Sequence, residues 1–250
     1  PPRSTLFPYT TLFRSAGTRT VARQVGIRVD ATAYGNPVTF TPGDRPFHAV
    51  DGQADTAWSV GAFNDVVGER LDLHLDRPAP VGHLLVLQAS LEGQNRWITE
   101  LRIHLDDRWI DVILDASSRS VPGQRLNLLG EEVSDIGLEI LGTDIGALDH
   151  YAGVTGVGFA EVVVDGVIAD ETIVLPTDLT DVVGADAGSE VVVLLTRQWS
   201  NPLDPIREQP ERAMDRTVTI PWDRTFLLRG DARLSTDAQI GRHTSELQSQ

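Results

Sequence analysis

The chain has 250 residues and a formal net charge of −15, and its 21 basic residues are all arginine. This acidity argues against a nucleic-acid partner, because nucleic-acid binding depends on basic side chains that neutralise phosphates. The chain has no cysteine, which excludes a disulfide framework, a zinc–thiolate site and a thiol nucleophile. No apolar run approaches the roughly 20 residues that span a bilayer.

The two ends of the chain do not read as parts of a fold. Residues 5–15, TLFPYTTLFRS, and residues 240–249, IGRHTSELQS, resemble translated sequencing adapters. A genuine amphipathic strand is the alternative at the N-terminal end. We therefore expect residues 1–15 and 240–250 to be adapter-derived, and the rest to be an internal piece of a longer protein.

Short segments of alternating hydrophobicity follow one another along the chain, each bounded by Gly, Pro, Asp or Asn. They lie at residues 25–34, 69–76, 82–90, 99–114, 135–142 and 158–167. Asp106-Asp107 predicts a tight turn between two strands of a hairpin. Because no convincing helical pattern separates these segments, the sequence predicts an all-β fold, an antiparallel jelly-roll β-sandwich over residues 16–170.

The composition changes after about residue 170. Residues 171–222 combine a strand-like run, VVVLLTRQW, with a segment dense in proline and charge, which predicts a strand followed by a linker. Strand patterning resumes at TVTIPW, and residues 223–239 are expected to be the first strand of a second, truncated β-domain. Such a truncated sandwich leaves an unpaired strand edge.

The most specific segment is HAVDGQADTAWSVG, residues 48–61. Its glycine-containing loop can fold back on itself, so that the carboxylate of Asp51, the hydroxyl of Thr56 and loop carbonyls converge on one point. Oxygen donors in such an arrangement are typical of a hard-cation site. Trp58, at the start of a strand, is expected to pack in the core.

This segment resembles the signature of discoidin (F5/8 type C) domains, many of which are carbohydrate-binding modules. GFAEV at residues 158–162 resembles the closing strand of the same family. The resemblance implies a discoidin-like sandwich with a structural Ca²⁺. Its implied ligands are the side chains of Asp51, Thr56 and Glu161 and main-chain oxygens of His48 and Gln53. The alternative is that Asp51 merely caps the turn and Glu161 is a surface residue.

A sugar site needs exposed aromatic side chains on loops at one end of a sandwich, with polar partners for the sugar hydroxyls. The candidates are Tyr34, Asn36, Arg45, Asn64, Asn95, Arg96, Trp97 and Tyr151, with Phe63 and Gln94 beside them. The run Asn95-Arg96-Trp97 is the most attractive, since it follows a glycine-containing loop directly before a strand. Trp97 fits a packing role as well as it fits ligand contact.

A wider set of segments, among them YGNP, VGERLDLHLDRP, QNRWITELRI and VLLTRQWSNP, resembles the extracytoplasmic part of actinobacterial α-(1→3)-arabinofuranosyltransferases. These are polytopic membrane glycosyltransferases of cell-wall arabinan assembly that carry F5/8-type modules. The resemblance implies a module that holds acceptor glycan, arabinan or arabinogalactan, at the extracytoplasmic face of the plasma membrane. It carries no catalytic residue over to this chain, because catalysis in those enzymes depends on an acidic residue near the membrane domain.

Two other functions stay open. The domain could be a structural spacer that binds no sugar, which would be favoured if Tyr34, Trp97 and Tyr151 were all buried. It could also be a glycoside hydrolase, which needs two carboxyl groups about 5 to 10 Å apart. So many acidic residues make such a pair inevitable. Neither GxSxG nor HExxH occurs, and His74 and His104 fall at strand positions that predict solvent-facing or packed roles.

Overall fold

The computed structural model describes residues 17, 19–36, 41–63, 65–91, 93–128, 130–145, 153–185, 192–193, 217–223 and 225–229. The chain divides into two compact units, Pro1–Ile220 and Pro221–Gln250. The described residues of the second unit form neither strand nor helix. Both expected adapter-derived ends, and all but two residues of the strand expected at VVVLLTRQW, lie outside the described residues. The truncated second domain stays a prediction.

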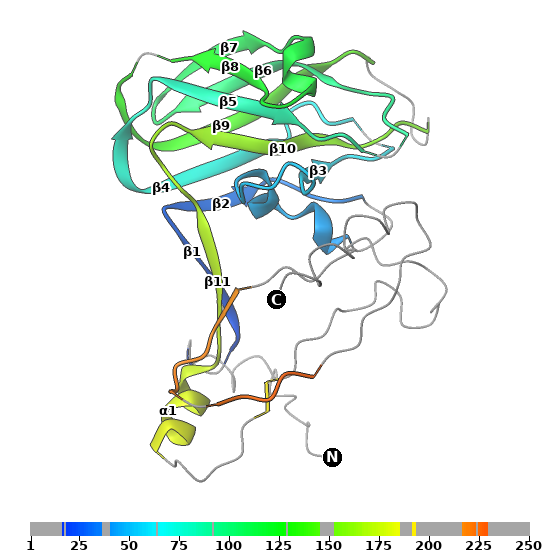
Figure 1. Ribbon diagram of the computed structural model, residues 1–250. Helices are drawn as coiled ribbons and strands as arrows, with labels where there is room; N and C mark the ends of the chain where they lie inside the picture. The colour runs from blue at the N-terminus through cyan, green and yellow to red at the C-terminus, as the bar shows by residue number, and fades with distance from the viewer. Residues whose placement is uncertain are drawn as a thin grey trace, which may run out of the picture. The chain divides into compact units, whose positions relative to one another are not determined.

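A five-stranded antiparallel sheet forms one layer of the sandwich (Figure 1). Its order is β2 (Ile27–Ala31), β4 (Arg70–Pro80), β9 (Glu132–Thr143), β6 (Ile98–Leu105) and β7 (Arg108–Ile113). Strands β6 and β7 form the hairpin that the sequence predicted across Asp106-Asp107. Asp106 has a φ of 49°, and its carboxylate accepts hydrogen bonds from two backbone N–H groups of β9. The turn is therefore fixed to the sheet.

A four-stranded antiparallel sheet forms the second layer. Its order is β3 (Trp58–Val60), β10 (Val157–Val164), β5 (His83–Gln88) and β8 (Gln124–Asn127). The register of β10 against β5 shifts between Phe159 and Glu161, which marks a bulge. A bulge changes which way the following side chains point, and Glu161 is the residue at which the regular register resumes.

The core lies between these two layers. Every second residue of the central strands is buried, as period-two patterning requires, and burial of each such side chain stabilises the fold by roughly 1.5–3 kcal/mol. The inward set includes Leu71, Leu73, Leu101, Ile103, Ile136, Leu138, Leu84, Val86 and Val162. Trp58 is 0% exposed, stacks on Phe159 at 5.7 Å and donates its indole N–H to the carbonyl of Ala33 at 2.9 Å. The prediction that Trp58 is a core residue is confirmed, as is the all-β sandwich.

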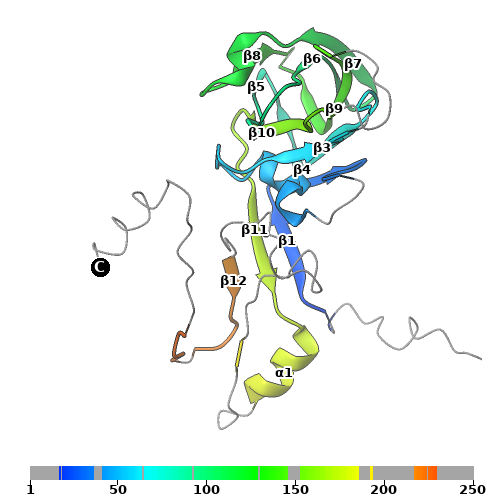
Figure 2. The ribbon, with the colours of Figure 1, turned by 90° about the vertical axis from the view of Figure 1, so that its right-hand side faces the viewer.

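A three-stranded sheet adjoins the sandwich. It consists of β1 (Val21–Val25), β11 (Asp170–Val174) and β12 (Thr217–Thr219), with β11 in the centre. Strand β1 runs antiparallel to β11, with Val21 opposite Val174, and β12 runs parallel to β11 (Figure 2). The helix α1 (Thr177–Ala185) follows β11. The sequence analysis did not anticipate β1, β11 or α1 as separate elements.

The connections between strands contain three short 3-10 helices. They are η3 (Pro42–Asp44), η4 (Pro46–Ala49) and η5 (Ala116–Arg119). No helix among the described residues has both the length and the apolar character needed to cross a membrane.

Candidate functional site

The turn-rich segment between η4 and β3 brings together the predicted cation ligands. Both carboxylate oxygens of Asp51 accept a hydrogen bond from the Thr56 hydroxyl, at 2.9 and 2.8 Å. The same hydroxyl lies 3.0 Å from the carbonyl oxygen of Gln53, whose backbone N–H donates to Asp51 at 3.0 Å. Gly52 has a φ of +78°, a conformation that favours glycine and lets the chain double back here. Oxygen atoms of three predicted ligands therefore meet in one loop.

Glu161 reaches the same loop from β10. It accepts a hydrogen bond from the backbone N–H of Gly52, but its Oε2 atom is buried and has no hydrogen-bond partner among the described residues. Burial, together with the negative charge of Asp51, raises the pKa of Glu161 to about 7. Burial also raises the pKa of Asp51. Two carboxyl groups whose pKa values are both raised, one of them with an unsatisfied oxygen, fit a divalent cation that would supply the missing positive charge.

The donor set defines which ion this site suits. Among the residues that the structure describes, no group of three or more His, Cys, Asp or Glu side chains gathers closely enough to hold a metal. A cation beside Asp51 and Glu161 would accordingly depend on hydroxyl and carbonyl oxygens for its other ligands. This all-oxygen set is the one that Ca²⁺ takes, whereas softer metals prefer nitrogen or sulfur.

Both ring nitrogens of His48 are engaged in hydrogen bonds, so its side chain offers no free ligand atom. It is 6% exposed, its Nδ1 lies 2.7 Å from the carbonyl oxygen of Gly43, and its Nε2 lies 3.1 Å from Nε of Arg45. Since Arg45 can only donate, Nε2 must accept and Nδ1 must carry the proton. Only the main-chain oxygen of His48 can contribute to a cation site, in agreement with the role that the resemblance implies.

Arg45 connects this loop to the three-stranded sheet. Its guanidinium pairs with Glu171 of β11 at 2.5 Å and lies over the ring of Phe47 at 5.5 Å. The side chain of Glu171 is only 7% exposed, and its other oxygen accepts a hydrogen bond from Gln24. This placement differs from the predicted sugar contact, because the guanidinium is already engaged in a largely buried ion pair. Glu171 was not anticipated, since nothing in the sequence links residues so far apart.

Three loops meet at one end of the sandwich, and Asn95 and Arg96 hold them together. The side chain of Asn95 accepts the backbone N–H of Thr155 at 2.9 Å and donates to the carbonyl of Gly153 at 3.2 Å. Arg96 is 2% exposed, and its guanidinium donates to the carbonyls of Gly61 and Thr155 at 2.7 and 2.9 Å. Arg96 thus braces the loops from below, which corrects its predicted role as a ligand contact. Burial lowers its pKa.

Exposed aromatic side chains lie on these braced loops. Tyr34 is 47% exposed, and its neighbour Gly35 exchanges backbone hydrogen bonds with Ser59 and Gly61. Phe63 is 39% exposed with a φ of 71°, and its N–H donates to the carbonyl of Val154 at 3.1 Å. We call this surface the loop end; it comprises Tyr34, Phe63, Asn95 and Trp97.

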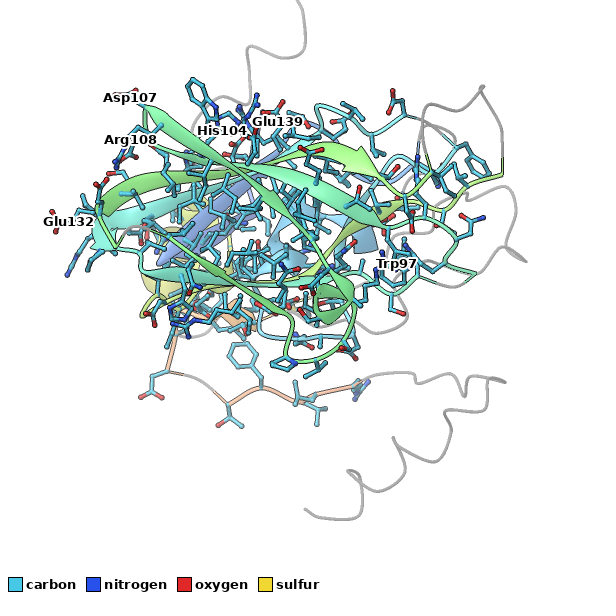
Figure 3. All side chains as sticks on the ribbon, turned by 90° about the horizontal axis from the view of Figure 1, so that it is seen from above. Trp97, His104, Asp107, Arg108, Glu132 and Glu139 are labelled. Carbon is cyan, nitrogen blue, oxygen red and sulfur yellow. The ribbon has the colours of Figure 1, made fainter. Side chains whose placement is uncertain are left out.

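Trp97 is half-buried at the loop end (Figure 3). Its backbone N–H donates to Asp144 at 2.8 Å, and the guanidinium of Arg119 lies 5.0 Å from its ring centroid. One ring face is therefore occupied by a cation, while the exposed part remains open to a ligand. The packing role expected for Trp97 is present in part, and its role as a ligand contact stays a prediction.

The other predicted sugar contacts are placed as follows. Asn36 is half-buried, next to Tyr34, and Gln94 is turned inward, with its side chain donating to the carbonyl of Arg96. Asn64 and Tyr151 lie outside the described residues, so their roles stay predictions.

Comparison with known proteins adds a likeness of fold. No protein-family model and no curated protein matches the chain. Solved structures are similar to it. The chain resembles carbohydrate-binding modules. The arabinofuranosyltransferase AftD from Mycobacteria shares 20% sequence identity at a TM-score of 0.49, over 63% of this chain and 13% of that one.

Two isolated modules are similar as well. A pectin binding carbohydrate binding module shares 18% identity at a TM-score of 0.41, over 58% of this chain and 93% of that one. The family 32 module of NanJ from C. perfringens, solved in complex with galactose, shares 14% identity at a TM-score of 0.38, over 60% of this chain and 100% of that one. The chain thus spans a small part of the transferase and nearly the whole of each module.

Proposed function

We propose that the chain is a carbohydrate-binding module and that the loop end is its glycan site. The observation that carries this proposal is the exposure of aromatic rings on loops that buried polar side chains hold in place. Tyr34 and Phe63 are exposed and Trp97 is half-buried, so the burial of Tyr34, Trp97 and Tyr151 together, which would favour a spacer, is not met. Because the loops are already ordered, binding loses little conformational entropy.

The finer proposal concerns the longer protein to which the chain belongs. The sequence resemblance favours an arabinofuranosyltransferase of cell-wall arabinan assembly, with this module at the extracytoplasmic face of the membrane. There it would hold acceptor arabinan or arabinogalactan. A weak site tethered to a catalytic domain raises the effective concentration of the polymer end, even when its own affinity is modest. The net charge of −15 suits a neutral glycan.

We also propose that Asp51, Thr56 and Glu161, with main-chain oxygens of His48 and Gln53, hold a structural Ca²⁺. Bound there, the ion would supply the positive charge that the two carboxylates lack. Its support is the buried Oε2 atom of Glu161 without a partner among the described residues. The loop after η4 and strand β10 would then be joined through the ion, which stabilises the sandwich without touching sugar.

Calorimetric titration of the chain with arabinan oligosaccharides tests the glycan proposal. Tyr34→Ala and Trp97→Ala are each expected to weaken binding about tenfold, the upper range for loss of one aromatic stacking contact. Asp107→Ala is the control, because Asp107 lies at the opposite end of the sandwich from Trp97 (Figure 3). Equal affinity of all three variants and the parent chain would contradict a site at the loop end.

A further inference from the structure

The outer face of the five-stranded sheet carries an exposed indole. Trp109 lies on the edge strand β7 and is 60% exposed. Within the described part of the chain, its indole N–H has no hydrogen-bond partner, and its one ring contact is the guanidinium of Arg102, 5.8 Å from the ring centroid. This exposed ring contributes little burial to the core, and it leaves an apolar face and a hydrogen-bond donor accessible to a ligand.

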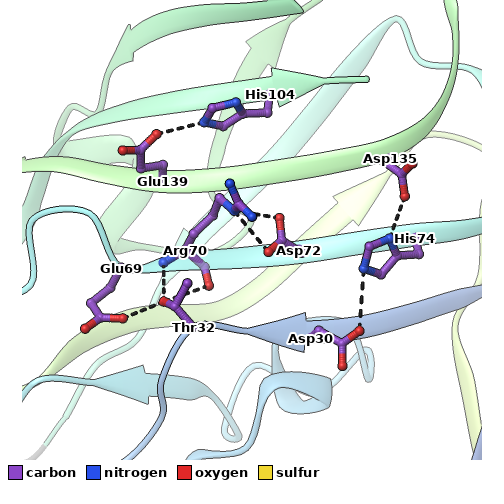
Figure 4. Close-up of polar contacts among 9 residues, drawn as sticks. All are labelled: Asp30, Thr32, Glu69, Arg70, Asp72, His74, His104, Asp135 and Glu139. Carbon is purple, nitrogen blue, oxygen red and sulfur yellow. Dashed lines mark hydrogen bonds and ion pairs between the residues drawn. The ribbon is translucent and has the colours of Figure 1, made fainter. Parts of the chain in front are cut away.

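Charged side chains beside Trp109 are held in fixed positions. Arg102 donates two hydrogen bonds to Asp111, at 2.8 and 3.0 Å, and these bonds hold the pKa of Asp111 below its usual range. His104 lies directly opposite Trp109 in the register and contacts Glu139 through Nε2 at 2.8 Å (Figure 4). Nδ1 of His104 has no partner among the described residues. Donors and acceptors around the ring are therefore ordered before any ligand arrives.

The strand next to His104 carries a glycine on this face. Gly137 of β9 lies between Asp72 and His104 in the register. A Cβ atom at Gly137 would come within 3.0 Å of a carboxylate oxygen of Asp72 and 3.3 Å of Cβ of His104. Only glycine fits here without displacing its neighbours, and it lets the side chains of Asp72 and Arg70 pack close to His104.

We propose that this surface, which we call the sheet-face site and define as Trp109 with Arg102, His104, Asp111 and Glu139, binds neutral glycan. One sugar ring would stack on the indole, and its hydroxyls would bond to the surrounding ordered donors and acceptors. The proposal adds a second site to the loop end, and it shares with the proposed function only the class of ligand.

Two observations favour a neutral glycan over other occupants. Carboxylates outnumber guanidinium groups on this face, so anionic polymers would be repelled. The outward carboxylates are those of Asp30, Asp72, Glu100, Asp111, Asp135 and Glu139, and the outward guanidinium groups are those of Arg28, Arg70 and Arg102. A protein partner is disfavoured because the cores of protein interfaces are depleted of charge, whereas here the ring is surrounded by charged groups. A sugar presents an apolar face and many hydroxyls, which suits both features.

The sheet-face site is separate from the loop end. Trp97 directly precedes β6 and His104 lies near the end of that strand. At about 3.3 Å per strand residue, the two are about 23 Å apart. Figure 3 shows the same separation, with His104 and Glu139 close together and Trp97 away from both. A short oligosaccharide can occupy only one site at a time, so the two sites can be titrated independently.

Nuclear magnetic resonance of the full chain tests the proposal. The chain has five tryptophans, so an ¹⁵N-labelled sample gives five indole N–H signals, and Trp109→Phe assigns the one from Trp109. Arabinan oligosaccharides should shift this signal saturably, both in the parent chain and in Trp97→Ala. Trp109→Ala should weaken binding at this site about three- to tenfold, the range for one aromatic stacking contact. Trp109→Phe should retain part of the affinity, and Ile113→Ala, exposed on the same strand face, should bind as the parent does.

Four outcomes would overturn the proposal. The first is a silent Trp109 signal while other resonances report Trp97-dependent binding, which leaves the loop end intact as a site. The second is an equal shift with polygalacturonate, because a neutral-glycan site should reject an anionic polymer. The third is a shift that follows protein concentration without glycan, which identifies a self-association surface. The fourth is an absence of arabinan binding anywhere on the chain, which overturns the loop-end proposal as well.

Discussion

Replacing Glu161 by Gln separates the electrostatic cost of the Asp51–Glu161 pair from its proposed benefit in holding Ca²⁺. Burial and the charge of Asp51 raise the pKa of Glu161 from 4.5 to about 7. A carboxyl group whose pKa is higher in the folded state binds its proton more tightly when folded. The contribution of this group to the free energy of unfolding is therefore fully present below pH 4.5 and is lost as the pH rises through 7.

The size of this loss follows from the shift. The full difference in pKa corresponds to about 3 kcal/mol, and solvent screening of a half-buried side chain reduces the expected effect to about 1–2 kcal/mol. Glutamine can still accept the hydrogen bond of Gly52 but cannot ionise. In the presence of a chelator, the free energy of unfolding of the parent chain should fall by that amount relative to Glu161→Gln between pH 5 and pH 8.

Calcium should reverse the order of the two proteins. At a concentration one hundred times its dissociation constant, Ca²⁺ stabilises the form that binds it by about 2.7 kcal/mol. Only the parent chain should gain this at pH 8, and the gain should shrink toward pH 5 as Glu161 takes up its proton. Urea unfolding followed by tryptophan fluorescence, with and without chelator, measures both effects. Parallel pH profiles of the two proteins in chelator would refute the electrostatic reasoning, and an equal calcium response would refute the site.

Three further predictions concern the packing that supports these sites. Trp58→Ala removes a fully buried ring and should lower the free energy of unfolding by about 3–5 kcal/mol in urea denaturation. Arg96→Met removes the donors of two loop carbonyls and should lower the free energy of unfolding by about 2–3 kcal/mol. Arabinan binding should weaken as well, whereas Arg125→Met, at an exposed arginine of β8, should leave both unchanged. Unchanged unfolding and binding of Arg96→Met would contradict the bracing role. Glu171→Gln weakens the largely buried ion pair with Arg45. Hydrogen exchange of the β1 and β11 amides should therefore accelerate, while exchange of the amides in the sandwich core stays constant. Uniform acceleration would contradict a local role of this pair.

The sandwich was predictable because each central strand has one face in the core and the other face in solvent. Alternation of large apolar and polar residues in β4, β6 and β9 is the direct result of one face packing inward. The buried Trp58 was predictable from its residue type at the start of a strand, and the hairpin turn from the pair Asp106-Asp107. The sequence analysis did not anticipate β1 or β11, since both are short and have mostly exposed or half-buried side chains, so neither leaves a period-two pattern in the sequence.

The candidate sites were predictable only in part, for a different physical reason. Asp51, Thr56 and Gln53 lie within one loop, and local chemistry brings them together. Arg96 was expected to contact sugar because it follows a glycine-containing loop directly before a strand, and its burial depends on carbonyls that distant loops supply. The sheet-face site depends on strand register, which places His104 opposite Trp109 only once the sheet is assembled.

The pairing of β1 with β11 determines how the sandwich responds to a pulling force. Strand β1, which leads into the sandwich, and strand β11, which leads out of it, run antiparallel. Val21 lies opposite Val174 at the far end, and Val25 lies opposite Asp170 next to the sandwich. A force that separates the chains at Val21 and Val174 opens this ladder like a zipper, one pair of residues at a time. Each step breaks few hydrogen bonds, so little force is needed. Tension in the flanking chain is therefore released as extra length from β1 and β11, while the strands that position the loop end keep their register.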